Sequence, residues 1–248
     1  MQYLLDTTQT VPPGVGFDMF GLTHLLWLVF FLVFAVCSCL LYRSLRSTQR
    51  EKMRLIFAAL LVADEIFKYI ILTVGDRWLA DYLPLHLCSV NIFLIAFHAV
   101  RPNKLLDNFL YTVCIPAAVA AMLFFTWTCL PFLNFIHLHS FTVHILLAVY
   151  PMMLLSGGDI VRDIRKVPHC IGILLIMAAI NFAVNLALDT NFMFLMYAPE
   201  GNPLYWFQQT FGNHFIGFPV LIAAVVAVMY LPSVRQLKER FGKKHAKV

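Results

Sequence analysis

Long apolar stretches are the feature that most limits what this chain can fold into. Seven runs of roughly twenty mostly apolar residues follow one another along the 248 residues, and about twenty such residues cross a bilayer as a helix. Charged residues make up 12% of the chain, against about a quarter in a soluble domain. We therefore expect an all-α, polytopic membrane helix bundle formed as a single transmembrane domain over residues 1–248. The predicted spans are 20–42, 54–74, 83–100, 105–127, 135–155, 169–188 and 212–231, and a basic tail follows over 232–248.

The positions of the basic residues predict how this bundle is oriented. All but two of the 18 Lys and Arg residues lie in the tail or in the connections after the first, third and fifth predicted helices. The exceptions are Arg77 and Lys68. Because cytoplasmic loops are enriched in Lys and Arg, we expect the N-terminus outside and the tail in the cytoplasm. The predicted location is the plasma membrane, as a multi-pass protein.

Several classes of function are not expected. The net charge of +5 comes from residues beside membrane helices, not from the basic, aromatic-interleaved face that nucleic-acid binding requires. Five of the six cysteines fall within predicted helices, so a disulfide framework of the secreted type is not expected. The first twenty residues lack the basic start of a cleavable signal peptide. We predict no cofactor and no soluble partner.

Polar residues inside the predicted helices are the candidates for a site. An ionisable side chain at the centre of a bilayer costs at least about 2.5–3.5 kcal/mol and usually serves a function. In the predicted orientation nearly all of them lie at mid-depth or in the outer half, so we predict one polar cavity open to the extracytoplasmic face. They are His24, Asp64, Glu65, Lys68, His86, Cys88, Asn91, His137, His139, His144, Asn181, Asn185, Asn213 and His214.

The residue types in this set leave three chemistries open. Cys88, with a His as base, forms the kind of pair that attacks an acyl carbonyl and holds the acyl group as a thioester, although a buried Cys is often only an apolar filler. Metal binding has less support, because no HExxH motif is present, and we predict no metal site. Glu65 and Lys68 are three residues apart and can pair on one helix face. That pair suits a transporter, a clamp between helices or a support for the nucleophile.

The predicted outer segment 189–211 is unusually long and aromatic. Aromatic residues commonly form a belt at the membrane interface, and a long ordered loop commonly covers a site. We therefore expect this segment either to form such a belt or to act as a lid, with Asn191 and Tyr197 in the lid or substrate segment.

Two sequence motifs resemble those of a known family. Leu83-Pro84-Leu85-His86-Leu87-Cys88-Ser89 is similar to the LPLHLCS signature of the YwaF-like bacterial integral membrane proteins. Glu65 and Lys68 fit the same pattern, as do Asn185, the segment Asn191-Phe192-Met193-Phe194-Leu195 and Pro199. The YwaF-like proteins resemble a eukaryotic transmembrane cysteine acyltransferase that remodels ether phospholipids. More distantly, they resemble fatty-acid ester hydrolases with a Thr nucleophile.

The resemblance implies a lipid acyltransferase or transacylase with Cys88 as nucleophile and His144 as its partner. Its substrates would be a membrane phospholipid or another acyl lipid. Supporting or oxyanion-binding roles are expected for His86, Asn91, His137, Asn185, Glu65 and Lys68. A non-catalytic lipid-binding or transport protein, or a fatty-acid ester hydrolase, remains the alternative. Membership of His24, His139 and His214 in the site is left open.

Overall fold

The computed structural model describes residues 3–245, with side chains for residues 3–231, and no strand occurs in this part. The all-α class is therefore confirmed, whereas the basic side chains of the predicted tail lie outside the described residues. The helices are α1 Leu22–Ser44, α2 Ser47–Val74, η1 Ala80–Tyr82, α3 Leu87–Val100, α4 Lys104–Phe109, η2 Leu110–Cys114, α5 Ile115–Leu123, α6 Phe135–Gly157, η3 Ile164–Lys166, α7 Val167–Leu188, η4 Phe192–Phe194, α8 Pro203–Phe211, η5 His214–Ile216 and α9 Gly217–His245.

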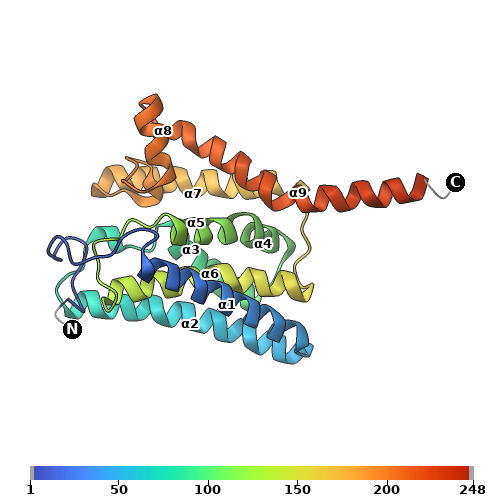
Figure 1. The fold of residues 1–248 in the computed structure, drawn as a ribbon, viewed down its shortest axis with the longest axis horizontal. Coiled ribbons are helices and arrows are strands. Elements are labelled where there is room, and N and C mark those ends of the chain that lie inside the picture. The colour runs from blue at the N-terminus through green and yellow to red at the C-terminus, as the bar shows by residue number, and fades with distance from the viewer. Residues whose placement is uncertain (1–2, 246–248) are drawn as a thin grey trace.

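Helix α6 is the centre of the bundle. It packs against α1, α2, α3 and α5, and most of it is buried. Helices α7 and α9 form an outer layer on the α4 and η2 side (Figure 1), and most of their apolar surface is exposed. In a membrane this surface contacts lipid tails, which require no polar covering.

Six helical segments of the described chain are long and apolar enough to cross a membrane. The second predicted span, 54–74, is not among them; it lies in α2, which has 28 residues and carries Asp64, Glu65 and Lys68 in its apolar stretch. The protein is thus a multi-pass membrane protein, while a count of seven spans remains a prediction. The six segments are Leu22–Ser44, Ala80–Val100, Lys104–Leu123, Phe135–Gly157, Ile164–Leu188 and His214–Leu231.

Two helix starts differ clearly from the predicted ones. Helix α2 begins at Ser47 rather than 54, and the backbone N–H of Arg46 donates to Gln49 Oε1 at 3.0 Å to close its first turn. Helix α3 begins at Leu87 rather than 83, because Pro84 disfavours helix in the residue before it and His86 is extended (φ −61°, ψ 149°). His86 is therefore the N-cap of α3, not a residue within the helix.

The connections of the bundle gather at its two ends. At the N-terminal end, Asn134 binds the carbonyls of Tyr3 and Asp6 through Nδ2, while its Oδ1 caps the first turn of α6. Arg77, which also lies at this end, pairs with Asp6 at 3.2 Å. The lone basic residue of the predicted outer face is thus neutralised.

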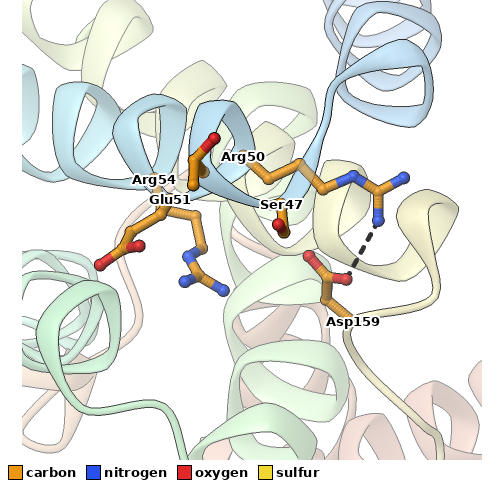
Figure 2. Close-up of a pocket in the computed structure, with 6 residues that line it drawn as sticks. Ser47, Arg50, Glu51, Arg54 and Asp159 are labelled. Carbon is orange, nitrogen blue, oxygen red and sulfur yellow. Dashed lines mark hydrogen bonds and ion pairs between the residues drawn. The ribbon is translucent and has the colours of Figure 1, made fainter.

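At the opposite end, Arg50 joins α2 to the end of α6 (Figure 2). Its Nη1 donates to the Gly157 carbonyl at 2.9 Å and lies 3.2 Å from Asp159 Oδ1. The other oxygen of Asp159 accepts from the Tyr42 hydroxyl of α1. Three helices are thereby held together at one place.

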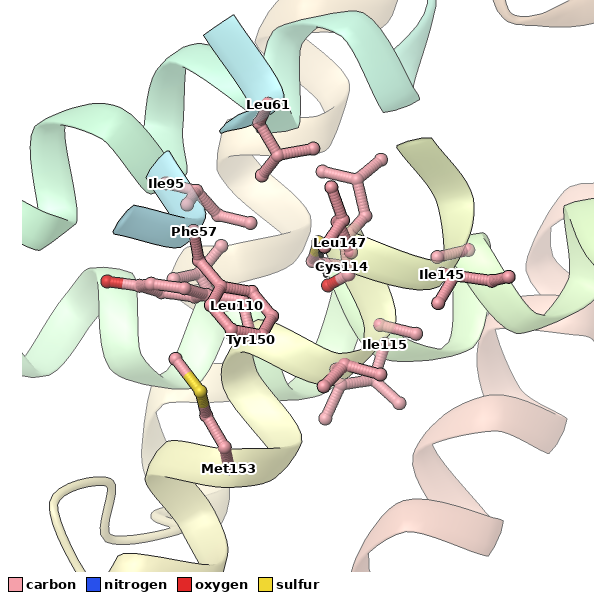
Figure 3. Packing of buried hydrophobic residues seen from close by; sticks show 14 of the residues in the cluster. Phe57, Leu61, Ile95, Leu110, Cys114, Ile115, Ile145, Leu147, Tyr150 and Met153 are labelled. Carbon is pink, nitrogen blue, oxygen red and sulfur yellow. Dashed lines mark hydrogen bonds between the residues drawn. The ribbon is translucent and has the colours of Figure 1, made fainter. Parts of the chain in front are cut away.

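Proline disturbs the helical hydrogen bonds at the start of α5 and inside α6, and a nearby feature compensates in each case. Pro116 follows a π-helical turn, η2, which provides room for a ring that would otherwise collide with the preceding turn. Pro151 lies inside α6 and leaves the Leu147 carbonyl without its helical donor. The Cys114 thiol donates to that carbonyl at 3.4 Å (Figure 3) and is itself fully buried. A neighbouring helix thus satisfies the freed group, as membrane helices with proline require.

We predict that Cys114→Ala is less stable than Cys114→Ser, because serine retains a donor for the Leu147 carbonyl and alanine does not. The expected difference is about 1 kcal/mol, the usual net value of one hydrogen bond, in unfolding of the purified protein in detergent. In a Pro151→Ala background the helix supplies its own N–H, so the difference should vanish. Equal stabilities of the two Cys114 variants would contradict this assignment.

Candidate functional site

A buried ion pair on α2 is the electrostatic centre of the candidate site. Lys68 Nζ donates to Glu65 Oε1 at 2.6 Å, and both residues are buried within the apolar part of the helix. Breaking such a pair leaves an unpaired charge and is strongly unfavourable. The pairing expected from the three-residue spacing is confirmed.

His139 of α6 extends this pair into a cluster of four ionisable groups. Its Nδ1 lies 2.8 Å from Asp64 Oδ2, and its Nε2 lies 3.6 Å from Glu65 Oε2. The contact with Asp64 does not have the angles of a hydrogen bond, so it is an electrostatic contact. His139 had no role assigned from the sequence, because residue spacing within one helix does not show which residues of a neighbouring helix lie opposite. Among the described residues no group of three or more His, Cys, Asp or Glu side chains could hold a metal ion.

Cys88 lies in the first turn of α3, beside the ion pair. Its side chain packs against the main core cluster, and Lys68 and Glu65 are near enough for their charges to act on the thiol. The helical bonds of α3 begin when the Val90 N–H donates to the His86 carbonyl at 3.0 Å. The amides of residues 87–89 therefore precede the helical hydrogen bonds. The start of a helix favours negative charge, whether on a thiolate or on an oxyanion.

His144 is held in one tautomer by its own helix. Its Nδ1 lies 2.6 Å from the Ser140 carbonyl, which only accepts, so Nδ1 carries the proton and Nε2 is left as a base. The imidazole stacks on Trp127 with 5.6 Å between ring centroids and 16° between planes. Trp127 was predicted as the last residue of the span 105–127 and not as part of a site, but α5 ends at Leu123, so Trp127 lies in the connection before α6.

No hydrogen bond joins Cys88 to His144, the two predicted catalytic residues, within the described residues. His86 lies two residues before Cys88 and is close enough to Lys68 and His144 for their charges to act on its imidazole. Catalytic hydrogen bonds are often long before substrate binds and tighten in the complex.

The segment after α7 is fastened beside the start of α3. Asn185 Oδ1 accepts from the Thr190 hydroxyl at 3.0 Å and from the Phe192 N–H at 2.7 Å, and its Nδ2 donates to the Phe192 carbonyl. The Met193 N–H in turn donates to His86 Nδ1 at 3.3 Å. Asn185 therefore anchors this segment, which contacts the residue that caps the Cys88 helix.

Asn191 and Tyr197, the two other residues predicted for this segment, take part in hydrogen bonds within the segment. Asn191 Nδ2 donates to the Tyr197 carbonyl at 2.9 Å, and Asn191 Oδ1 accepts from the Met196 N–H at 2.9 Å. The Tyr197 ring is exposed. Both residues shape the segment, and a direct role toward substrate stays a prediction.

The histidines near α1 have partners of their own. His137 Nε2 accepts from Trp27 Nε1 at 2.8 Å. His24 Nδ1 accepts from the Phe20 N–H at 2.9 Å, and its Nε2 lies 2.8 Å from the Met122 carbonyl. The prediction that all polar residues share one cavity is corrected in this respect, because local backbone and ring donors engage His24, His137 and Asn185 in separate clusters.

Several buried polar atoms of the described side chains have no hydrogen-bond partner, and those of Asp64, Glu65 and His139 belong to the candidate site. Buried polar groups are normally hydrogen-bonded, so these atoms need water or a ligand. Apart from Arg54 Nε at the opposite end, they are Asp64 Oδ2, Glu65 Oε2, Asn91 Oδ1, Trp127 Nε1, His137 Nδ1, His139 Nδ1, Asn181 Oδ1 and His214 Nε2 within the side chains described.

We predict that Glu65→Gln destabilises the protein by about 3–5 kcal/mol, because it leaves the buried Lys68 ammonium without its counter-ion. The double variant Glu65→Gln, Lys68→Met removes both charges and should recover most of the loss. Unfolding in detergent measures both effects. If the single and the double variant are equally stable, the pair is not the buried electrostatic contact described.

The comparisons with known proteins identify the family. The model of the TMEM164 family matches residues 19–230, which includes α1 to α8, η5 and the apolar half of α9. The searches of curated proteins and of solved structures give no match. The matched region contains the α2 ion pair, Cys88 and His144 together, and the chain belongs to the TMEM164 family.

Proposed function

We propose that this protein is a membrane-embedded lipid acyltransferase that uses Cys88 as nucleophile and His144 as base. The observation that carries the proposal is a thiol in the first turn of α3, beside the buried Lys68–Glu65 pair. A cysteine that only fills apolar space has no need to lie at a helix start or beside charged side chains. The helix start and the Lys68 ammonium favour a thiolate, the reactive form of cysteine, whereas burial and the Glu65 carboxylate oppose it, so a base is required.

The reaction would proceed through a thioester. His144 Nε2 takes the Cys88 proton, and the thiolate attacks the ester carbonyl of a donor phospholipid. The ester C–O bond then breaks, and His144 returns the proton to the leaving hydroxyl. In the second half, His144 takes the proton of an acceptor hydroxyl, which attacks the thioester and releases the Cys88 thiol.

The oxyanion would be bound by the backbone amides at the start of α3, alongside Asn91, which was also predicted for this role. The free amides of its first turn adjoin the thiol, whereas Asn185 and His137 are engaged elsewhere. Preorganised amides of this kind are a major source of transition-state stabilisation. Lys68, held by Glu65, adds positive charge near the thiol.

The resemblance to the YwaF-like proteins and to the acyltransferase that remodels ether phospholipids supports the same chemistry. In the predicted orientation the site would act on the outer leaflet of a plasma membrane. Cover from the segment 189–211 would exclude water and favour transfer over hydrolysis. A lipid-binding or transport protein would use the same residues without forming a thioester.

We predict that a thiol-directed or acyl activity probe in native membranes labels the wild type and loses its label in Cys88→Ala. His144→Ala should reduce labelling at least tenfold, the lower range of general-base contributions being about a hundredfold. Cys170→Ala is the matched control, since Cys170 is a buried cysteine of α7 in a hydrophobic cluster separate from the main core. Equal labelling of wild type and Cys88→Ala would end the enzyme proposal.

We also predict that Trp127→Ala slows labelling of Cys88, because His144 loses the ring on which it stacks. Trp127→Phe retains a stacking ring and should restore most of the rate. Single-exponential labelling rates in membranes measure the difference. If both variants react equally fast, the stack does not position the base.

A further inference from the structure

A groove of about 900 Å³ lies between α1, α2 and α6, apart from Cys88 and His144. Its walls are apolar and include Leu26 and Phe30, which are 59% and 52% exposed. The helices that form it cross the membrane or lie alongside those that do. An open apolar groove in such a place is filled by lipid.

The length of the groove fits the tail of a lipid from one leaflet. Its α1 wall runs from Leu26 to Phe34, which is about 12 Å at 1.5 Å per residue. One leaflet of the hydrocarbon core is about 15 Å thick. Phe132, from the connection at the N-terminal end, also lines the groove, so the groove lies in the half of the membrane nearer that end.

One charged group lines this otherwise apolar groove. Asp64 contributes to the wall, and its side chain is 23% exposed, whereas its Oδ2 is buried against His139. His139 lies behind it at 2.8 Å and offsets part of the cost of a carboxylate in hydrocarbon. A carboxylate accepts about four hydrogen bonds, so Asp64 has capacity left for a donor in the groove. Thr142, whose side chain can donate or accept, is a second polar residue of the lining.

We propose that this groove binds a neutral lipid with a free hydroxyl group, such as a monoacylglycerol. Its tail lies along α1, and its hydroxyl donates to Asp64. Charge selects this class, because the Asp64 carboxylate repels fatty acids and other lipids with an anion at that depth. A lipid without a donor leaves the carboxylate unsatisfied, which is the expensive outcome for a buried acceptor.

The test uses the full-length protein in phosphatidylcholine nanodiscs and a monoacylglycerol with a photoreactive, clickable tail. Saturable labelling is expected on peptides of α1, α2 and α6, displaced by excess unlabelled monoacylglycerol. The same probe with both hydroxyls methylated should bind about three- to tenfold more weakly, the loss expected for one hydrogen bond.

Two variants separate the hydroxyl contact from the tail contact. Asp64→Leu should bind the two probes equally, whereas Leu146→Trp, which narrows the apolar wall, should weaken both. Cys88→Ala should bind like the wild type, so the result is independent of the proposed acyl transfer. Equal binding of the two probes to the wild type, or label spread over all lipid-facing helices, means ordinary annular lipid only and overturns the proposal.

Discussion

The burial of the Glu65–Lys68 pair in α2 is the constraint on which the rest of the site depends. Two opposite charges at 2.6 Å in an apolar helix are tolerable only if the bundle closes around them and they stay together. The surrounding helices supply that closure, since α3 and α6 both pack on α2. The same packing brings the start of α3, with its thiol, beside the ammonium of Lys68. The ion pair that is costly to bury is therefore the same contact that holds a positive charge near the Cys88 thiol.

Much of the fold could be predicted from the sequence, because apolar length and helical spacing are local properties. The apolar stretches became helices, and Glu65 and Lys68 paired as their spacing required. The helices at Ser47 and Leu87 begin at residues other than the predicted span starts, because capping and proline geometry depend on a few backbone angles. The π-turn before Pro116 and the thiol that serves Leu147 depend on contacts between helices, which a pattern within one helix does not contain.

The candidate site was predictable as a set of residues but not as an arrangement. Cys88, His144, Glu65 and Lys68 were named from residue type, spacing and resemblance, and the structure pairs Glu65 with Lys68 near Cys88. Asn185 was predicted for a supporting or oxyanion-binding role, and its side chain anchors the segment after α7. Trp127 and His139 went unassigned, since their neighbours come from other helices. Some polar residues in a membrane helix thus serve chemistry, and others hydrogen-bond backbone groups. The packing between helices shows which role each residue has.

The central claim is that Cys88 carries an acyl group during turnover. Mass spectrometry of the protein after incubation in vesicles of phospholipid with isotopically labelled acyl chains tests it most directly. A labelled, hydroxylamine-sensitive acyl group is expected on the peptide that contains Cys88, and it should accumulate when no acceptor lipid is present. A protein that turns over labelled lipid while Cys88 stays unmodified under those conditions, or that retains full turnover as Cys88→Ser, would contradict it.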